Sequence, residues 1–125
     1  MEEEKKKIKS FTDLIAWSKG HELVIEIYDV TKKFPKEEIF GITNQIRRCA
    51  VSITSNIAEG FSRRTHKDKA QFYCIALGSL TELQNQLLIV RDIHYIDEVK
   101  FQTLANKSVI IHKLINGLIK SSRSF

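Results

Sequence analysis

The chain has 125 residues, of which 42% are hydrophobic and 28% are charged, so it is one domain long and has apolar residues for one core. This composition excludes a disordered chain, and no apolar run reaches the roughly 18 residues of a membrane-spanning helix. The first residues lack the apolar segment of a secretory signal. We therefore expect a cytoplasmic protein without a membrane partner, with a flexible charged tail over residues 1–10 and a helical domain over residues 11–125.

The first predicted helix follows a capping box formed by Ser10 and Asp13. It ends before Pro35, because the residue ahead of a proline is pushed out of the helical region. Residues at core spacing along it are Leu14, Trp17, Val24, Ile27 and Tyr28.

The second predicted helix begins at Thr43 as N-cap and ends at Gly60, where a left-handed glycine cap is expected. Its apolar stripe is Ile46, Cys49, Ala50, Ile53 and Ile57. Beside it runs a polar stripe of Gln45, Arg48, Ser52, Asn56 and Glu59. Because a solvated face is usually rich in Lys and Glu, we expect this polar stripe to contact another helix, another subunit or a ligand.

The third predicted helix starts at a capping box of Thr65 and Asp68. Its core set is Phe72, Ile75, Ala76, Ser79, Leu80, Leu83 and Leu87. Gly78 lies in the middle of this helix and costs about 1 kcal/mol of helix propensity relative to Ala. We therefore expect a neighbouring helix to approach closely at Gly78.

The fourth predicted helix is capped by Asp97. Its apolar residues are Phe101, Leu104, Val109, Ile111, Leu114, Leu118 and Ile119, which is enough to bury more than one face. Extra apolar surface on a small bundle usually means that another subunit covers it. Since short loops make successive helices antiparallel, we predict an all-α, up-down-up-down four-helix bundle.

Signatures of enzymes and metal sites are missing from the sequence. There is no Gly-rich phosphate loop, no nucleophile elbow, no Glu-x-x-His pair and no Arg followed by His at the spacing of small helical ribonucleases. We expect no catalytic residue, no metal and no cofactor. Cys49 and Cys74 both lie in apolar helical patterns, which predicts reduced core residues rather than a disulfide.

The net charge of +5 is unevenly distributed, because residues 41–70 carry six basic and two acidic side chains and residues 101–125 carry four basic and none acidic. The basic residues of the first block that we single out are Arg47, Arg63, Arg64, Lys67 and Lys69. Such side chains on a helix end and loop can meet phosphates without reading bases. No aromatic residue is interleaved between Arg63 and Lys69, so a stacking platform is weakly supported. The alternative, that these basic residues bind no specific partner, stays open.

A partner is also predicted for the arginine of the polar stripe. Glu82 follows Gly78 by one turn, and an arginine at a helix interface needs a fork-shaped acceptor. We therefore predict that Arg48 pairs with Glu82, while the alternative, that both are separately solvated, remains open.

Several of these segments together resemble one protein family. They are Phe11-Thr12-Asp13-Leu14 with Trp17, Phe34-Pro35, residues 45–60, and Ala76-Leu77-Gly78-Ser79 with Glu82-Leu83. They resemble the bacterial four-helix-bundle family, also called the 23S ribosomal RNA intervening-sequence proteins, from Phe11 to the C-terminus. Thr54 stands where many members carry Pro, so the second helix should be less kinked there.

The resemblance implies an antiparallel bundle that assembles with itself as a ring-shaped homopentamer and has no established activity. The family is similar to the accessory protein of diversity-generating retroelements, which associates with a reverse transcriptase and nucleic acid. We predict a non-enzymatic, oligomeric helical scaffold with weak, largely sequence-independent binding of RNA or DNA, whose protein partner could be a reverse transcriptase. The alternative is a structural or protein-binding module that binds no nucleic acid.

Overall fold

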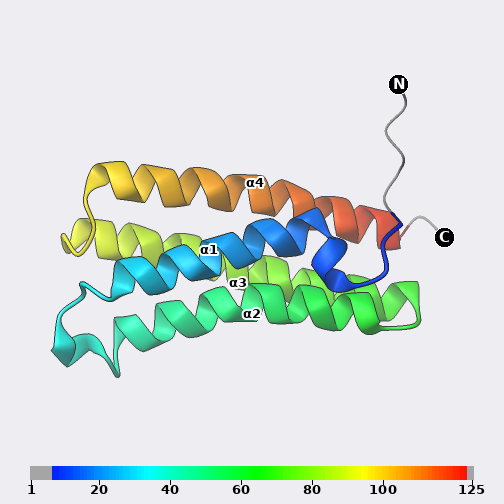
Figure 1. Cartoon of the computed structure of the whole chain (residues 1–125), viewed down its shortest axis with the longest axis horizontal. Coiled ribbons are helices and arrows are strands. Elements are labelled where there is room, and N and C mark those ends of the chain that lie inside the picture. Colours follow the sequence, from blue (N-terminus) through cyan, green and yellow to red (C-terminus); the bar gives the residue numbers. More distant parts are fainter. Residues whose placement is uncertain (1–6, 124–125) are drawn as a thin grey trace.

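The computed structural model describes residues 7–123 and is helical almost throughout. The four long helices are α1 (Ile15–Thr31), α2 (Ile42–Ser62), α3 (His66–Asp92) and α4 (Glu98–Ser122). Two single 3₁₀ turns, η1 (Phe11–Asp13) and η2 (Lys36–Glu38), precede α1 and α2. The helices run alternately up and down (Figure 1), so the predicted all-α four-helix bundle is confirmed.

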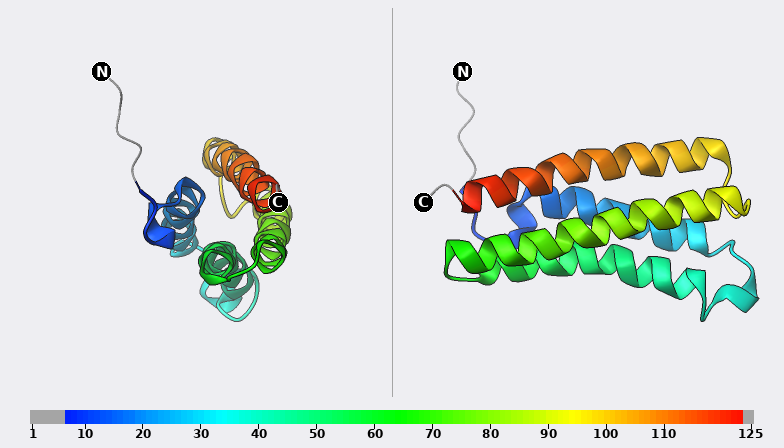
Figure 2. Two further views of the ribbon diagram at one scale, coloured as in Figure 1. Left: turned by 90° about the vertical axis from the view of Figure 1, so that its right-hand side faces the viewer. Right: turned by 180° about the vertical axis from the view of Figure 1, so that it is seen from behind.

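Each helix packs against the next, and α1 also packs against α4, which closes the bundle around one core (Figure 2). The contact between α2 and α3 is the most extensive. Side chains less than 2% exposed come from all four helices and include Leu23, Ile27, Ile46, Ile53, Ile57, Leu80, Leu83, Leu87, Leu104, Ile111 and Ile115. No helix in the described chain is both long and apolar enough to cross a membrane. Most of the expected N-terminal tail, residues 1–6, lies outside the described residues.

Three of the predicted helix starts are confirmed. Ser10 Oγ accepts a hydrogen bond from Thr12 N, and Asp13 Oδ2 accepts one from Ser10 N, although this capping box starts η1 and α1 follows it. Thr65 Oγ1 accepts from Asp68 N at 3.1 Å at the start of α3. Asp97 Oδ1 accepts from Lys100 N at 2.7 Å at the start of α4. Local side-chain chemistry therefore sets these boundaries.

The two predicted ends of α2 are wrong. Gly41 occupies the N-cap position, and Thr43 lies inside the helix, where its buried Oγ1 has no hydrogen-bond partner. Gly60 does not end the helix, which continues to Ser62, and no described glycine has a positive φ. A Cβ at Gly60 would lie 2.7 Å from Cε1 of Tyr73, so this glycine lets α3 approach α2 closely.

Three residues expected in the core are on the surface instead. Tyr28, Ile75 and Val109 are 40%, 46% and 47% exposed. The close neighbour expected at Gly78 is also absent, because a Cβ there would meet nothing within 4 Å. For the three exposed residues the apolar pattern was wider than the face that one bundle can cover, since each helix contacts only two neighbouring helices.

Candidate nucleic-acid interface

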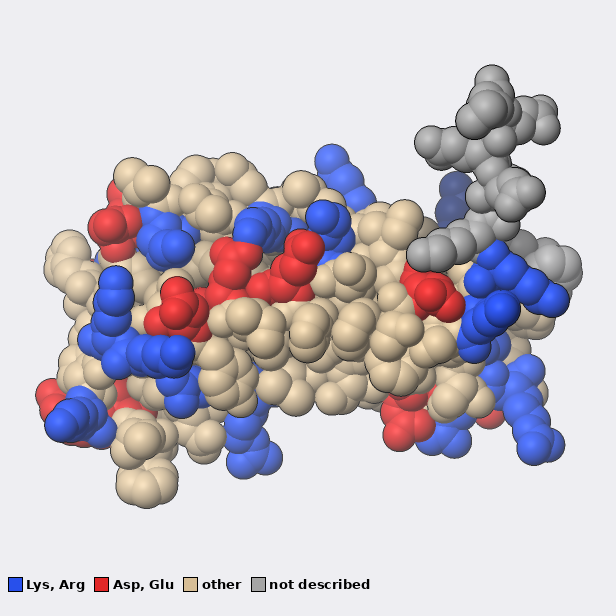
Figure 3. Space-filling model, in the orientation of Figure 1, with Lys and Arg blue, Asp and Glu red and all other residues tan. Residues whose placement is uncertain are grey.

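Basic side chains gather at the end of the bundle where α2 is joined to α3 and where α4 ends, on the right of Figure 3. The basic residues in the segments that form this end are Lys7, Lys9, Arg63, Arg64, His66, Lys67, Lys69, Lys120 and Arg123. The acidic residues of the same segments are Asp13, Glu59 and Asp68. We call this surface the basic end. Its excess of positive charge attracts polyanions.

Arg63, the first residue after α2, is held against the helix surface. Its Nη2 lies 3.2 Å from Glu59 Oε2, and its guanidinium stacks over the ring of Phe72 at 4.5 Å. The ion pair is exposed and contributes little to stability, because water and salt screen it. The cation–π contact fixes where the positive charge stands.

Lys69 is engaged with the backbone at the end of α2. Its Nζ donates to the carbonyl of Phe61 at 2.6 Å and lies 5.3 Å from the centre of the Phe61 ring. A lysine in this position satisfies a helix-terminal carbonyl and opposes the negative end of the helix dipole. In the sequence no aromatic residue lies between Arg63 and Lys69, but folding brings Phe61 and Phe72 next to these cations. Each of the two rings is already in contact with a positive group.

Arg64 and Lys67 are exposed, and their side chains form no hydrogen bond or ion pair within the described part of the chain. They differ in this from Arg63 and Lys69, whose charged groups have partners. Binding a phosphate through Arg64 or Lys67 therefore breaks no contact of the bundle. Among the predicted residues, these two are the most available to an anion.

Arg47 lies apart from the other four predicted binding residues. Its Nε donates to Thr31 Oγ1 at 2.8 Å, and its guanidinium covers the ring of Tyr28 at 4.8 Å. Arg47 lies on α2 and precedes Arg63, the residue directly after this helix, by 16 positions, which separates the two by about 24 Å at a rise of 1.5 Å per residue. Arg47 joins α1 to α2 and is not part of the basic end.

Much of the polar stripe of α2 faces α3. The Oγ atoms of Ser52 and Ser79 lie 2.8 Å apart, and Asn56 Nδ2 donates to the carbonyl of Ser52. A polar pocket of about 350 Å³ lies along this contact, lined by Asn44, Gln45, Arg48, Cys49, Ser52, Ser79 and Glu82. Glu59, the last member of the stripe, lies at the basic end and pairs with Arg63.

The predicted ion pair between Arg48 and Glu82 is not present among the described residues, although both line this polar pocket. Both are exposed, so each can be solvated separately. Glu82 instead acts on Cys49. Burial, together with the nearby Glu82 carboxylate, raises the pKa of the Cys49 thiol to about 12. The thiol donates to the carbonyl of Ser79 at 3.0 Å.

Cys74 contradicts the sequence prediction, because it is exposed whereas Cys49 is buried. We expect iodoacetamide at pH 8 to alkylate Cys74 in the folded protein and to leave Cys49 unmodified. With a pKa of about 12, only about one Cys49 thiol in ten thousand is the reactive thiolate at that pH. Mass spectrometry of peptides after timed labelling checks this, with labelling in urea as the control; equal rates in the folded state would contradict it.

Within residues 7–123, no group of three His, Cys, Asp or Glu side chains comes together that could hold a metal ion. The site therefore consists of cationic groups and hydrogen-bonding side chains. Such a set can bind anions through charge and N–H donors.

Comparisons with known proteins identify relatives by sequence and by fold. The model of the 23S rRNA-intervening sequence protein family matches residues 12–117. A crystal structure from Bacteroides thetaiotaomicron, described as a protein with unknown function from the S23 ribosomal protein family, is similar with a TM-score of 0.79 and 26% sequence identity. The similarity covers 85% of this chain and 99% of that one. No curated protein is detectably similar in sequence.

Proposed function

The chain belongs to the 23S rRNA-intervening sequence protein family, and from this membership and its basic end we propose that it is a non-enzymatic helical scaffold that binds nucleic acid through phosphates. The observation that carries the proposal is the gathering of basic side chains at one end of the bundle (Figure 3). At this end α2 is joined to α3, and the sequence there carries Arg63, Arg64, Lys67 and Lys69. The opposite end mixes Lys and Arg with Asp and Glu in nearly equal number.

The mode of binding follows from the chemistry of these side chains. Lysine and arginine at the basic end contact phosphates, which are the same for every sequence, and no residue pattern in the sequence suggests base readout. Each phosphate contact releases counterions, so affinity falls as salt rises. Binding is therefore largely independent of sequence.

The test is a titration of a labelled single-stranded RNA, followed by fluorescence anisotropy at several salt concentrations. We expect the triple variant Arg63→Gln, Arg64→Gln, Lys67→Gln to lose about tenfold or more in affinity at low salt, and the slope of log affinity against log salt to become shallower by about 2. Lys69 is left unchanged because it caps α2.

The matched control removes three charges from the opposite end, with Lys32, Lys33 and Lys36 each changed to Gln. These lysines are exposed, so their substitution should affect stability as little as the substitutions of the first variant do. Wild-type protein that does not bind RNA or DNA at low salt, or a control that loses as much affinity as the triple variant, would overturn the proposal.

We propose further that the scaffold is oligomeric through the exposed face of α3. Exposed residues recur along that helix with spacings of three and four, the spacing of a helix–helix contact: Ile75, Gly78, Glu82, Asn85 and Ile89. The two isoleucines are 46% and 41% exposed, and Gly78 leaves open space between them. A second copy of the chain packed there covers the apolar groups and explains a glycine in mid-helix.

Assembly is tested by light scattering at micromolar protein concentration. We expect a mass well above the 14.5 kDa of one chain, and a smaller mass for Gly78→Gln, because the longer side chain fills the space that a partner helix needs. Gly117→Gln is the control, since Gly117 is also an exposed helical glycine with nothing near its Cβ position. A monodisperse wild-type monomer would rule out the oligomer.

A second candidate function is a structural or protein-binding module without nucleic-acid binding. The exposed apolar residues of α3 favour it, because they suit a protein surface and contribute nothing to phosphate binding. The salt titration separates the two functions, since this module assembles without binding RNA or DNA.

A further inference from the structure

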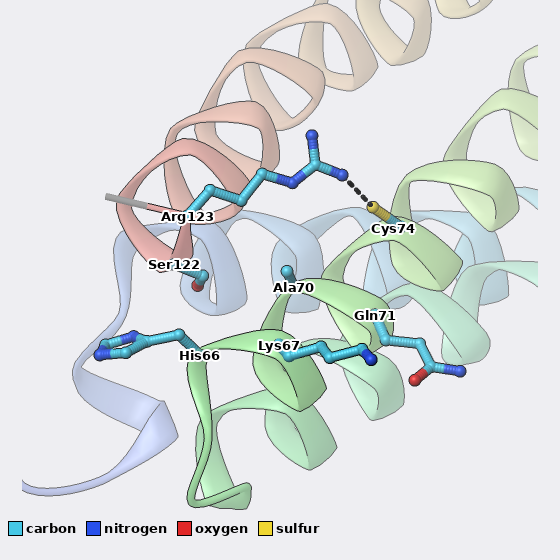
Figure 4. Close-up of a pocket in the computed structure, with 7 residues that line it drawn as sticks. All are labelled: His66, Lys67, Ala70, Gln71, Cys74, Ser122 and Arg123. Carbon is cyan, nitrogen blue, oxygen red and sulfur yellow. Dashed lines mark hydrogen bonds between the residues drawn. The ribbon is translucent and has the colours of Figure 1, made fainter. Parts of the chain in front are cut away.

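A pocket opens on the basic end between the first turns of α3 and the last turn of α4 (Figure 4). Its volume is about 510 Å³, within the range of sites that hold small organic ligands. The residues that line it are His66, Lys67, Ala70, Gln71, Cys74, Ser122 and Arg123. Its walls thus come from two helices that are far apart in the sequence.

Two cations flank this pocket. Lys67 on α3 and Arg123 at the end of α4 lie on opposite sides of Ala70, and none of the lining residues is acidic (Figure 4). Arg123 Nη2 reaches Cys74 Sγ at 3.9 Å, a weak contact because sulfur is a poor acceptor. Both cations can therefore turn to an anion without breaking a strong contact.

We infer that this pocket binds one unpaired nucleotide of a nucleic-acid strand, with its phosphate between Lys67 and Arg123. The inference rests on the proposed function and makes it more specific. Arginine suits this role because its planar guanidinium donates two parallel hydrogen bonds to phosphate oxygens. Arg123 belongs to the basic block of residues 101–125, so the end of α4 contributes to the phosphate contact together with Lys67 of α3.

The size and the other walls of the pocket favour a nucleotide over a bare phosphate. A phosphate group would leave most of the volume empty, whereas Gln71 offers both a donor and an acceptor and Ala70 an apolar surface. A duplex keeps its bases stacked inside the helix, so only its phosphates could reach the two cations. We therefore expect single strands to enter the pocket and duplexes to remain outside it.

Alkylation of Cys74 reports whether the pocket is occupied, because this exposed thiol is part of its wall. We expect a single-stranded RNA of twelve nucleotides at low salt to slow labelling of Cys74 by iodoacetamide about tenfold when about 90% of the protein is bound. A duplex of the same length, and a nucleoside monophosphate at the same concentration, should give much less protection. Labelling of a small free thiol in the same tube controls for effects on the reagent.

The role of Arg123 is tested by substitution in the full-length chain. We expect Arg123→Gln to weaken binding of the single strand about tenfold and to reduce protection of Cys74, since a charge-assisted hydrogen bond is lost. Lys113→Gln, which removes one charge from an exposed position on the same helix, should change neither. Circular dichroism of both variants checks that they fold.

The outcomes distinguish this inference from the proposed function. RNA that binds with wild-type affinity while Cys74 is labelled at its free rate overturns the pocket and leaves the basic end as the interface. If duplex and single strand protect Cys74 equally, the pocket does not require an unpaired nucleotide, and the inference is overturned. If the monophosphate protects Cys74 as well as the single strand does, the ligand is a free nucleotide and not part of a strand, which also overturns the inference. RNA that does not bind at all overturns both proposals.

Discussion

Ile27→Ala is expected to lower the free energy of unfolding by about 2–5 kcal/mol. Ile27 lies on α1 and is 1% exposed, so the substitution removes buried methyl and methylene groups and leaves a cavity that the surrounding helices can fill only in part. Urea unfolding followed by far-ultraviolet circular dichroism measures the change, at one protein concentration because assembly would couple to stability.

Ile25→Ala provides the matched control for this experiment. It is the same substitution two residues earlier on the same helix, but Ile25 is 57% exposed. Little burial is lost there, and alanine has the better helix propensity, so the change should lie within about 0.5 kcal/mol of zero. Equal losses for the two variants would mean that α1 does not pack on the bundle as the structure shows.

The sequence predicts well the features that depend on neighbouring residues. Thr65 and Asp97 were expected at helix starts, and both accept hydrogen bonds from the backbone there. A cap is formed by residues within one turn, so it can be recognised from a few positions. The kind and order of the helices follow from the spacing of apolar residues and from short loops.

Features that depend on the neighbouring helix are harder to predict. Tyr28 and Ile75 fit the apolar period of their helices but are 40% and 46% exposed, and the face of the Tyr28 ring is covered by Arg47 of α2. Gly60 fits a helix end by residue type, yet its position is explained by the ring of Tyr73 on α3. Such contacts join residues that no local pattern links.

The candidate interface also has features that the sequence predicts and features that only the packing of the helices reveals. The positive block of residues 41–70 indicates the basic end, but the sequence could not show that Arg47 lies about four turns away from it. Nor could it show that Lys69 binds the end of α2 while Lys67 is free of such contacts. No local pattern links Arg123 to Lys67, which lies 56 positions earlier; the net positive charge of residues 101–125 is the sequence signal for Arg123.

Gly60→Ala is expected to destabilise the protein by about 1–2 kcal/mol, although alanine is a better helix former than glycine. The new Cβ would lie 2.7 and 2.9 Å from two atoms of the Tyr73 ring and 3.1 Å from Phe72 Cβ. Tyr73 is 3% exposed and packs in the core, so its ring or the two helices must shift to admit the new Cβ. This cost exceeds the gain of up to about 1 kcal/mol from helix propensity.

Gly117→Ala is expected to change the stability in the opposite direction, and the comparison shows whether the contact with α3 causes the loss at Gly60. Gly117 is also inside a helix, but a Cβ there meets nothing within 4 Å, so only the propensity gain remains and stability should rise by about 0.5–1 kcal/mol. Thermal and urea unfolding of both variants measure the difference. If Gly60→Ala were stabilising by as much as Gly117→Ala, the close approach of α3 at Gly60 would be wrong, and Gly60 would be an ordinary helical glycine.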